Sequence, residues 1–399
     1  MFDNESKLTQ LRFDKVILSR QRPLKVCEVP GLLHSRPSPV SMPEEHCMST
    51  KSVAAKNAVL LTAIVMIVAA AALVASLTNE SLARAKSPQN TGRPNLRLPD
   101  EAAGIDEIAR TLVSAFDQVD IVALGEAHRR RLDSDLRIAV VRDPEFAKKV
   151  RSILVEFGST TEQATLDRYI RGENVSRTEL EQVWKTTEAG PHGVWDFPIY
   201  ADFFAAVREV NSKLPANARI RVFGGDPGPS GNRSRDSAAI SILKEQVLQK
   251  RGKALVIYGA GHFYRTAGDG RDFHSVMGDI GIARTIEVEY PGRTFVVIPL
   301  GYRLVLPPGV AAGIDPDYQK FDRALKTQVR PVLVPLQSLP FRDFTAEEFL
   351  GGTVTTCRGA GGCVSVFKDS PLTLGQIADA CVYVGPSVAD VDTKARPAR

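Results

Sequence analysis

IVALGEAH (121–128) and ALVIYGAGH (254–262) follow one pattern, in which an apolar run stops at glycine and then delivers a histidine. The chain holds only six histidines in 399 residues, so placing His128 and His262 in this way uses a scarce residue type twice. A neutral imidazole is a general base near neutral pH, and a neighbouring carboxylate such as Glu126 orients it. The two stretches therefore predict acid–base chemistry.

The elements that position these residues follow from the apolar pattern. Short runs rich in Val and Ile are typical of strands buried on both faces of a parallel sheet, and they occupy residues 120–125, 152–158, 220–226 and 254–261. Amphipathic segments alternate with them, at 131–150, 161–172, 177–187, 197–214 and 234–252. We expect an α/β fold with an open, largely parallel sheet flanked by helices, extended by strands at 283–290 and 294–306.

Acidic side chains and histidines follow the carboxyl ends of four predicted strands. In open parallel sheets, ligands bind beyond these ends. The four strand ends carry Glu126 and His128, Glu156, Asp226, and His262. One interpretation is a histidine base with a second histidine as acid. The other is a divalent metal held by Glu126, His128 and His262. The sequence contains no GxSxG, and Glu-x-His is not the helical HExxH spacing of zinc peptidases.

Four motifs in order carry a family resemblance: LGEAH (124–128), VEFGSTTEQATLDRYIRGE (155–173), RDSAAI (235–240) and GAGHFYR (259–265). Together they resemble the ChaN/erythromycin-esterase-like superfamily, which includes Tiki-type proteins, over about residues 118–265. The short Glu-x-His spacing is closer to the ChaN-like branch. The resemblance implies an α/β core and a site with Glu126, His128, Glu156 and His262, and with Arg235 and Asp236 near its edge.

The resemblance implies more than one activity. Some members hydrolyse esters with a histidine base, some are metal-dependent peptidases, and ChaN-like members are associated with haem or iron uptake. Our hypothesis is a hydrolase in which His128 is the base, Glu126 or Glu156 orients it, and His262 is the acid or electrophile. The alternative is a haem- or iron-binding uptake protein without turnover. A third interpretation, an interaction module, leaves the convergence of four strand ends unexplained.

The segment EAGPHGVWDFPIY (188–200) departs from the superfamily pattern. His192, Trp195 and Tyr200 are expected either to line a ligand pocket, with Tyr200 or His192 as a haem ligand, or to pack a helix start onto the core. The other residues expected to bind a small-molecule substrate are Asp226, Arg235, Asp236, Tyr264 and Arg265.

AVLLTAIVMIVAAAALVASL (58–77) is uncharged and twenty residues long. As a helix it would span roughly 30 Å, the apolar thickness of a bilayer. Lys51 and Lys56 precede it and predict a cytoplasmic N-terminus. Residues 57–78 are therefore expected to be a transmembrane anchor or, if translation starts at Met48 rather than Met1, a signal peptide. We expect the protein to be membrane-anchored or secreted, with its site in an extracytoplasmic (periplasmic) space.

The expected organisation is a disordered or mis-assigned extension (1–56), the membrane or signal segment (57–78), a linker (79–100), the α/β domain (101–306) and a Pro-rich extension packed on it (307–399). Cys357 and Cys363 bracket CRGAGGC and would form a disulfide in an oxidising compartment, whereas Cys381 lies in an apolar run that predicts a buried thiol. The net charge of +5 is mild and shows no clustered basic patch, so we expect no nucleic-acid partner.

Overall fold

The computed structural model describes residues 96–229, 234–265, 281–301, 317–351, 355–357, 363–365 and 367–385. The predicted membrane or signal segment at 57–78, the extension before it and residues 79–95 of the linker lie outside the described residues. Among the residues described, no helix has the length and apolar character needed to cross a bilayer.

The described residues form an α/β fold around one eight-stranded sheet. Its strands are β1 (Ala102–Ala103), β2 (Ile121–Glu126), β3 (Ser152–Ser159), β4 (Arg221–Asp226), β5 (Ala254–Gly259), β6 (Thr294–Leu300), β7 (Val332–Pro335) and β10 (Ala380–Tyr383). The four strands predicted first along the chain, β2 to β5, are confirmed within one or two residues at each end. Every residue of β2 and β5 is buried, as a strand covered on both faces requires.

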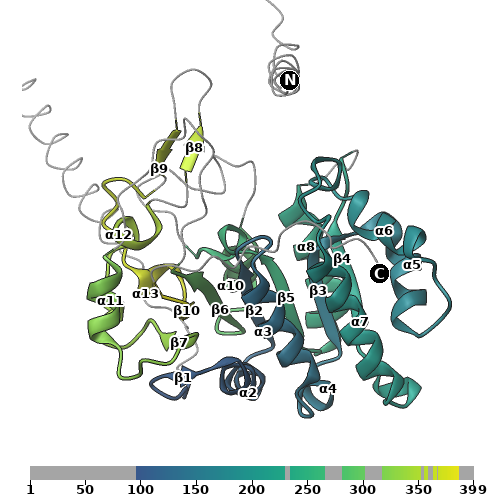
Figure 1. Ribbon diagram of the computed structural model, residues 1–399, viewed down its shortest axis with the longest axis horizontal. Coiled ribbons are helices and arrows are strands. Elements are labelled where there is room, and N and C mark those ends of the chain that lie inside the picture. Colours follow the sequence, from purple (N-terminus) through teal and green to yellow (C-terminus); the bar gives the residue numbers. More distant parts are fainter. Residues whose placement is uncertain are drawn as a thin grey trace, which may run out of the picture. The chain divides into compact units, whose positions relative to one another are not determined.

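The strand order is β1-β7-β10-β6-β2-β5-β3-β4 (Figure 1). Neighbours from β10 to β4 pair in parallel, whereas β7 runs antiparallel to both β10 and β1. The prediction of a largely parallel sheet is therefore confirmed. Because β2, β5, β3 and β4 point the same way and lie side by side, their carboxyl ends share one edge.

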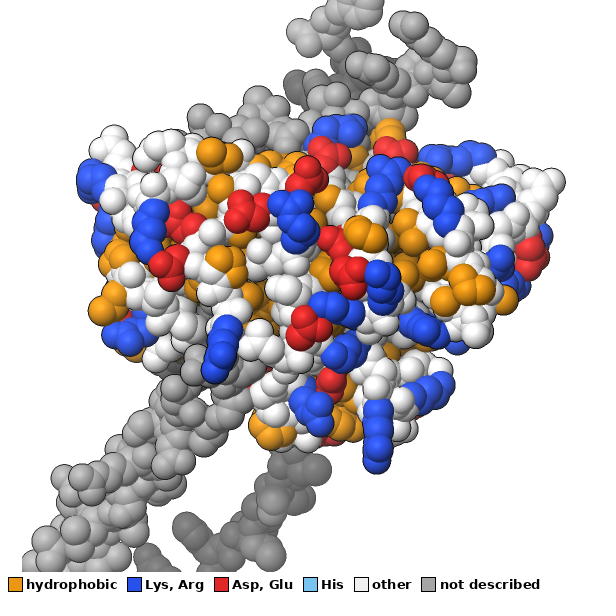
Figure 2. Space-filling model, turned by 90° about the horizontal axis from the view of Figure 1, so that it is seen from below, with side chains coloured by type: hydrophobic (Ala, Val, Ile, Leu, Met, Phe, Trp, Pro, Cys, Tyr) orange, Lys and Arg blue, Asp and Glu red, His pale blue; other side chains and the backbone are white. Residues whose placement is uncertain are grey.

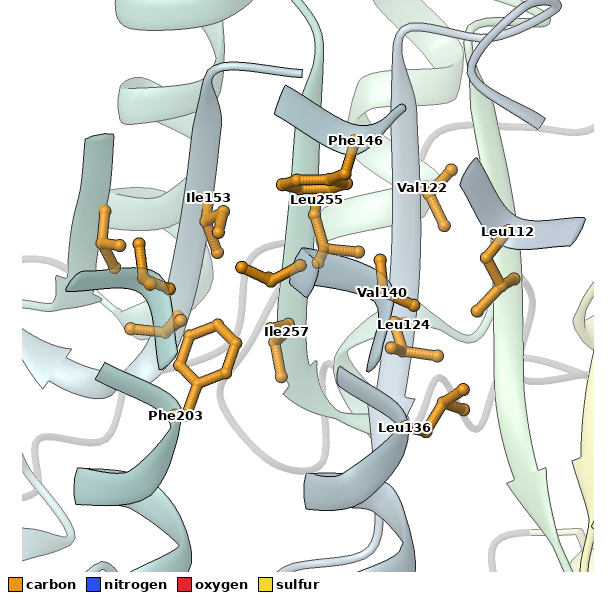
Figure 3. Close-up of a cluster of buried hydrophobic side chains, with 14 of the residues drawn as sticks. Leu112, Val122, Leu124, Leu136, Val140, Phe146, Ile153, Phe203, Leu255 and Ile257 are labelled. Atoms are coloured by element: carbon orange, nitrogen blue, oxygen red, sulfur yellow. The ribbon is translucent and has the colours of Figure 1, made fainter. Parts of the chain in front are cut away.

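One apolar layer covers the first face of the sheet. Its helices are α2 (Ile105–Ala115), α3 (Arg131–Arg142), α4 (Phe146–Lys149), α5 (Gln163–Ile170), α6 (Arg177–Lys185) and α7 (Pro198–Ser212). Figure 3 shows part of this layer, where Leu112, Leu136, Val140, Phe146 and Phe203 from the helices lie over Val122, Leu124, Ile153, Leu255 and Ile257 from the strands.

A second layer covers the opposite face, where the alternate strand residues point. Its helices are α8 (Arg235–Ile242), α10 (Ile282–Glu289), α11 (Tyr318–Ala324), α12 (Ala346–Leu350) and α13 (Leu374–Ile377). Charged side chains lie outside both layers. On the face in Figure 2, basic and acidic groups are intermixed rather than gathered by sign.

Two parts of the chain differ from the expectation. Residues 283–290, predicted as a strand, are helical (α10): Ile282, Ala283 and Ile286 are buried at helical spacing, whereas Val288, which a strand would bury with Ile286, is 79% exposed. The stretch 307–399, predicted as an extension packed on the domain, instead contributes β7 and β10 to the central sheet.

The cysteine predictions have different outcomes. Cys381 is a fully buried free thiol on β10, as predicted, and burial raises its pKa. Cys357 and Cys363 are opposite each other in the antiparallel ladder of β8 (Thr355–Cys357) and β9 (Cys363–Ser365). Their side chains lie outside the described part of the structure, so the disulfide stays a prediction.

A buried ion pair fastens β10 into the sheet. Asp379, which precedes β10 and is 5% exposed, pairs with the Arg265 guanidinium through Oδ1 and accepts the Val296 N–H through Oδ2 at 2.7 Å. Arg265 also donates to the Thr294 carbonyl at 2.8 Å. Arg265, expected to bind substrate, therefore joins β6 to β10.

Replacing Asp379 with Ala should lower the free energy of unfolding by about 3–5 kcal/mol, because it leaves a buried guanidinium without its counter-charge. Urea denaturation followed by circular dichroism measures this loss. Asp343→Ala is the matched control, because Asp343 forms an exposed pair with Arg342, and such pairs contribute at most about 1 kcal/mol. Equal losses of unfolding free energy in the two variants would contradict a stabilising role for the buried Asp379–Arg265 pair.

Candidate active site

Glu126, the last residue of β2, is a buried carboxylate held on three sides. Its Oε2 pairs with the guanidinium of Arg137 from α3. Its Oε1 accepts the Tyr200 hydroxyl at 3.3 Å and lies 3.0 Å from Nδ1 of His128. The carboxylate is thus fixed by two helices before it meets the imidazole.

His128 follows β2 in a turn over the end of the sheet, with 35% of its side chain exposed. The contact with Glu126 uses Nδ1 and so directs Nε2 away from that carboxylate. Burial works against protonation of this ring, but the hydrogen bond to Glu126 and the charge of Glu156 outweigh it and raise the pKa of His128. A partly exposed imidazole oriented by one carboxylate has the form of a general base.

Two neighbours confine the His128 ring. The Trp195 ring meets it edge-to-face with centroids 4.7 Å apart. On β5, a Cβ built on Gly259 would lie 2.9 Å from His128 Cε1 and 3.1 Å from Nε2, which is closer than carbon atoms pack. Glycine at 259 therefore lets the imidazole rest directly against the strand.

Glu156 on β3 is fully buried and is the centre of the site. Its Oε2 accepts the Gly259 N–H at 2.7 Å, and its Oε1 accepts Nη1 of Arg235 at 2.9 Å. The same Oε1 lies 3.4 Å from Nε2 of His262. Burial alone would raise the pKa of Glu156, but the charges on His262, His128 and Arg235 hold it well below its usual range.

His262 lies in the short helix η7 (Ala260–Phe263) directly after β5. Its Nδ1 is 2.5 Å from Oδ1 of Asp236, whose other oxygen accepts the Gly281 N–H at 2.7 Å. Burial opposes the charged ring, but Glu156 and Asp236 overcome it and raise the pKa of His262 to about 10. His262 is therefore a cation at neutral pH, with only 11% of its side chain exposed.

The site thus has two carboxylate–imidazole pairs of different character. Glu126–His128 is supported by α3 and α7 on the first face of the sheet, and Asp236–His262 by α8 on the other. A titrating imidazole beside one that stays protonated supplies a base and an electrophile together.

The first part of this constellation matches a known family. Residues 112–219 match the haem-binding uptake family ChaN of the Tiki superfamily. Over this stretch the chain is ChaN-like. The match includes Glu126, His128 and Glu156 and stops before Asp236 and His262, so the predicted resemblance is confirmed for the first half of the site. The chain matches no curated protein.

The solved structures that align with this chain have low sequence identity to it. A Bacillus cereus protein is 12% identical with a TM-score of 0.48, over 77% of this chain and 96% of its own. The erythromycin esterase EreC is 10% identical with a TM-score of 0.46, over 72% and 95%. ChaN of Campylobacter jejuni, solved with cofacially bound haem, is 13% identical with a TM-score of 0.31, over 49% and 87%.

The metal interpretation does not fit the described side chains. The Glu126 oxygens are taken by Arg137, Tyr200 and His128, and Nδ1 of His262 is taken by Asp236. Across the described ranges, no group of three or more His, Cys, Asp or Glu residues is arranged to hold a metal ion. Glu126, His128 and His262, predicted as metal ligands, therefore do not form a metal-binding group.

The predicted haem ligands of the ChaN-like stretch fit no better. Tyr200 is fully buried, and its hydroxyl is engaged by Glu126 and by the N–H of Arg129 at 3.1 Å. His192 is exposed in the short helix η3 (Gly190–His192). A groove of about 850 Å³ lies between α2 and α3, and neither Tyr200 nor His192 lines it.

The remaining predicted residues divide between site and scaffold. Arg235 contacts Glu156 and Trp195 contacts His128, as described above. Tyr264 is 4% exposed and packs on Phe367, with its pKa raised by burial, so it lies in the core rather than on a substrate surface. Asp226 is fully buried, and its Oδ1 accepts two backbone N–H groups, from Glu188 at 2.8 Å and Gly228 at 2.7 Å.

Arg137 is the site residue that the sequence interpretation missed. It is 1% exposed, and its guanidinium also stacks on Phe157, Tyr200 and Phe203, at 4.8, 5.0 and 5.5 Å from the ring centroids. A signal was present, because Asp133 and Arg137 fall at helical spacing on the face of α3 that also buries Leu136. Charged residues on an apolar helix face indicate buried partners.

Glu126→Gln should lower the pKa of His128 towards the ordinary value of about 6.5 and leave His262 unchanged, because the variant removes the charge at Nδ1. Asp236→Asn is the matched variant and should lower only the pKa of His262. NMR titration of [13C]histidine-labelled protein measures both. A change at the same histidine in both variants would contradict two separate pairs.

Asp226→Asn tests a buried acid, since Oδ2 of Asp226 has no partner among the described residues. Burial raises the pKa of Asp226 to about 6, although the N–H groups of Glu188 and Gly228 lower it. Between about pH 4 and pH 6 the unfolded carboxyl ionises before the native one, so stability falls as pH rises, by on the order of 2 kcal/mol.

Urea denaturation at pH 4 and at pH 7, for the wild type and for Asp226→Asn, measures the effect. Asn keeps the acceptor oxygen and removes the titration, so the variant should be the more stable protein at pH 7 and equal to the wild type at pH 4. The exposed Asp343→Asn is the control. An unchanged pH dependence in Asp226→Asn would show that the carboxyl is already ionised in the native protein at pH 4.

Proposed function

We propose that the protein is a hydrolase of small esters in which His128 activates water. The observation that carries the proposal is the pair of imidazoles, each fixed through Nδ1 by its own carboxylate and both coupled to buried Glu156. The ChaN-like match supports the first half of this set, since it includes Glu126, His128 and Glu156.

In the proposed reaction, Nε2 of His128 takes a proton from a water molecule as that water attacks the ester carbonyl. Glu126 holds the Nδ1–H and stabilises the imidazolium that forms. The negative charge that develops on the carbonyl oxygen would meet the His262 cation. Nε2 of His262 lies 3.4 Å from Oε1 of Glu156, a contact longer than a strong hydrogen bond, and would donate its N–H to the carbonyl oxygen. As the tetrahedral intermediate collapses, the ester C–O bond breaks and the His128 imidazolium returns its proton to the leaving alkoxide, which departs as the alcohol.

Glu156 has an electrostatic role in this scheme. As a buried anion it keeps His262 protonated and raises the pKa of His128, so it sets both partners in their working states. Arg235, 21% exposed at the side chain, offsets part of its charge. Glu156 and the two carboxylate-bound imidazoles therefore act as one unit.

His128→Ala should reduce kcat/KM for 4-nitrophenyl esters by about 10²–10⁴-fold, the usual contribution of a general base. His192→Ala is the control, because that histidine is exposed in η3 and belongs to neither carboxylate–imidazole pair. For the wild type, activity should rise with pH through the raised pKa of His128, above about 6.5, and fall above pH 10 as His262 loses its proton.

Undiminished hydrolysis in His128→Ala, with a normal circular dichroism spectrum, would reject His128 as the base. Saturable haemin binding by the purified protein, lost on His128→Ala and without turnover of any ester, would favour an uptake role for the same site.

A further inference from the structure

Arg129, the residue after His128, is held in an unusual backbone conformation. Its φ of 68° lies in the left-handed region, which residues with a side chain seldom adopt. Its N–H donates to the Tyr200 hydroxyl at 3.1 Å, and the same hydroxyl donates to Glu126 at 3.3 Å. One tyrosine thus fixes both Arg129 and the carboxylate that orients His128.

The Arg129 guanidinium lies over an aromatic ring rather than beside an acid. Its carbon is 5.2 Å from the centroid of Phe197, which is 6% exposed. Phe197 is two residues after Trp195, the ring that confines His128. A cation held on a buried ring keeps its hydrogen-bond donors available along its edge.

The Arg129 guanidinium has no counter-charge among the described residues. In this it differs from the other arginines of the site. Arg130 pairs with Asp133, Arg137 with Glu126 and Arg235 with Glu156. A partly exposed, unpaired guanidinium on a fixed turn beside the base is a donor set suited to a carboxylate or phosphate group.

We propose that Arg129 binds an anionic group of the substrate, so that the substrate class is esters carrying a carboxylate or phosphate close to the scissile bond. This proposal rests on the proposed hydrolysis only in that it identifies the bound anion as part of a substrate. The anion contact itself depends only on the geometry of Arg129 and Phe197.

The first experiment measures anion binding without turnover. The full-length [13C]histidine-labelled protein is titrated with inorganic phosphate, with succinate and with uncharged glycerol, following the His128 signal, which the His128→Ala spectrum assigns. We expect a saturable change with one or both anions and none with glycerol. Arg129→Gln should weaken this binding by about 10–100-fold, the effect of losing a charged hydrogen bond, and Arg129→Lys should retain part of it.

Arg142→Gln is the matched control, because Arg142 is exposed and pairs with Glu209 on the helical surface. Phosphate and succinate distinguish the two anion types by their relative affinities. The proposal is overturned if neither anion gives a saturable change, or if Arg129→Gln and wild type bind equally well.

The second experiment compares 4-nitrophenyl acetate with mono-4-nitrophenyl succinate, which differ by one carboxylate. The wild type and Arg142→Gln should prefer the anionic ester, and Arg129→Gln should lose that preference through a raised KM rather than a lowered kcat. If neither ester reacts, ester hydrolysis fails in this assay, while the anion titration still decides the role of Arg129.

Discussion

The site depends on keeping a carboxylate charged where water does not reach it. Glu156 is fully buried, and an isolated ion in such a place would take up a proton. Three donors from different elements prevent this: the Gly259 N–H on β5, Arg235 at the start of α8, and His262 in η7. That retained charge raises the pKa of both imidazoles. The arrangement is therefore a small charge network in which no member keeps its state alone.

The two imidazoles differ because their surroundings differ. His262 meets two carboxylates and little solvent, whereas His128 meets one carboxylate and is 35% exposed at the side chain. Proximity to the same buried anion thus raises the pKa of both rings, and that of His262, which meets two carboxylates, to about 10. Pairs of like groups with separated pKa values are a general device of acid–base catalysis.

Much of this could be predicted from residue types and strand periodicity. The convergence of Glu126, His128, Glu156 and His262 follows from parallel strands that end at one edge, and the structure places all four there. The direction of side chains one or two residues further on could not be predicted in the same way. Tyr264 and Arg265 belong to the last motif but turn into the core, because η7 rotates the chain after β5.

Other features depend on contacts far apart in the sequence. Arg137 belongs to the site only because Glu126 ends β2 opposite α3, and no local pattern gives that distance. The helix α10 contains β-branched residues that favour a strand locally, yet it lies in the crossover between parallel strands β5 and β6, and such connections are usually helical. The run around Cys381 is recognisably apolar in the sequence, but the places of β7 and β10 in the sheet could not be predicted.

The position of β10 has a consequence for how the molecule is made. This strand inserts between β6 and β7, so residues 380–383 complete the middle of a sheet that begins with residues 102–103. Until the ribosome has released that segment, β6 presents an open edge of backbone donors and acceptors, which other extended chains can occupy. Translation therefore passes through an interval, from the emergence of β6 to that of β10, in which this edge is open, and a chaperone that shields the β6 edge would act in that interval.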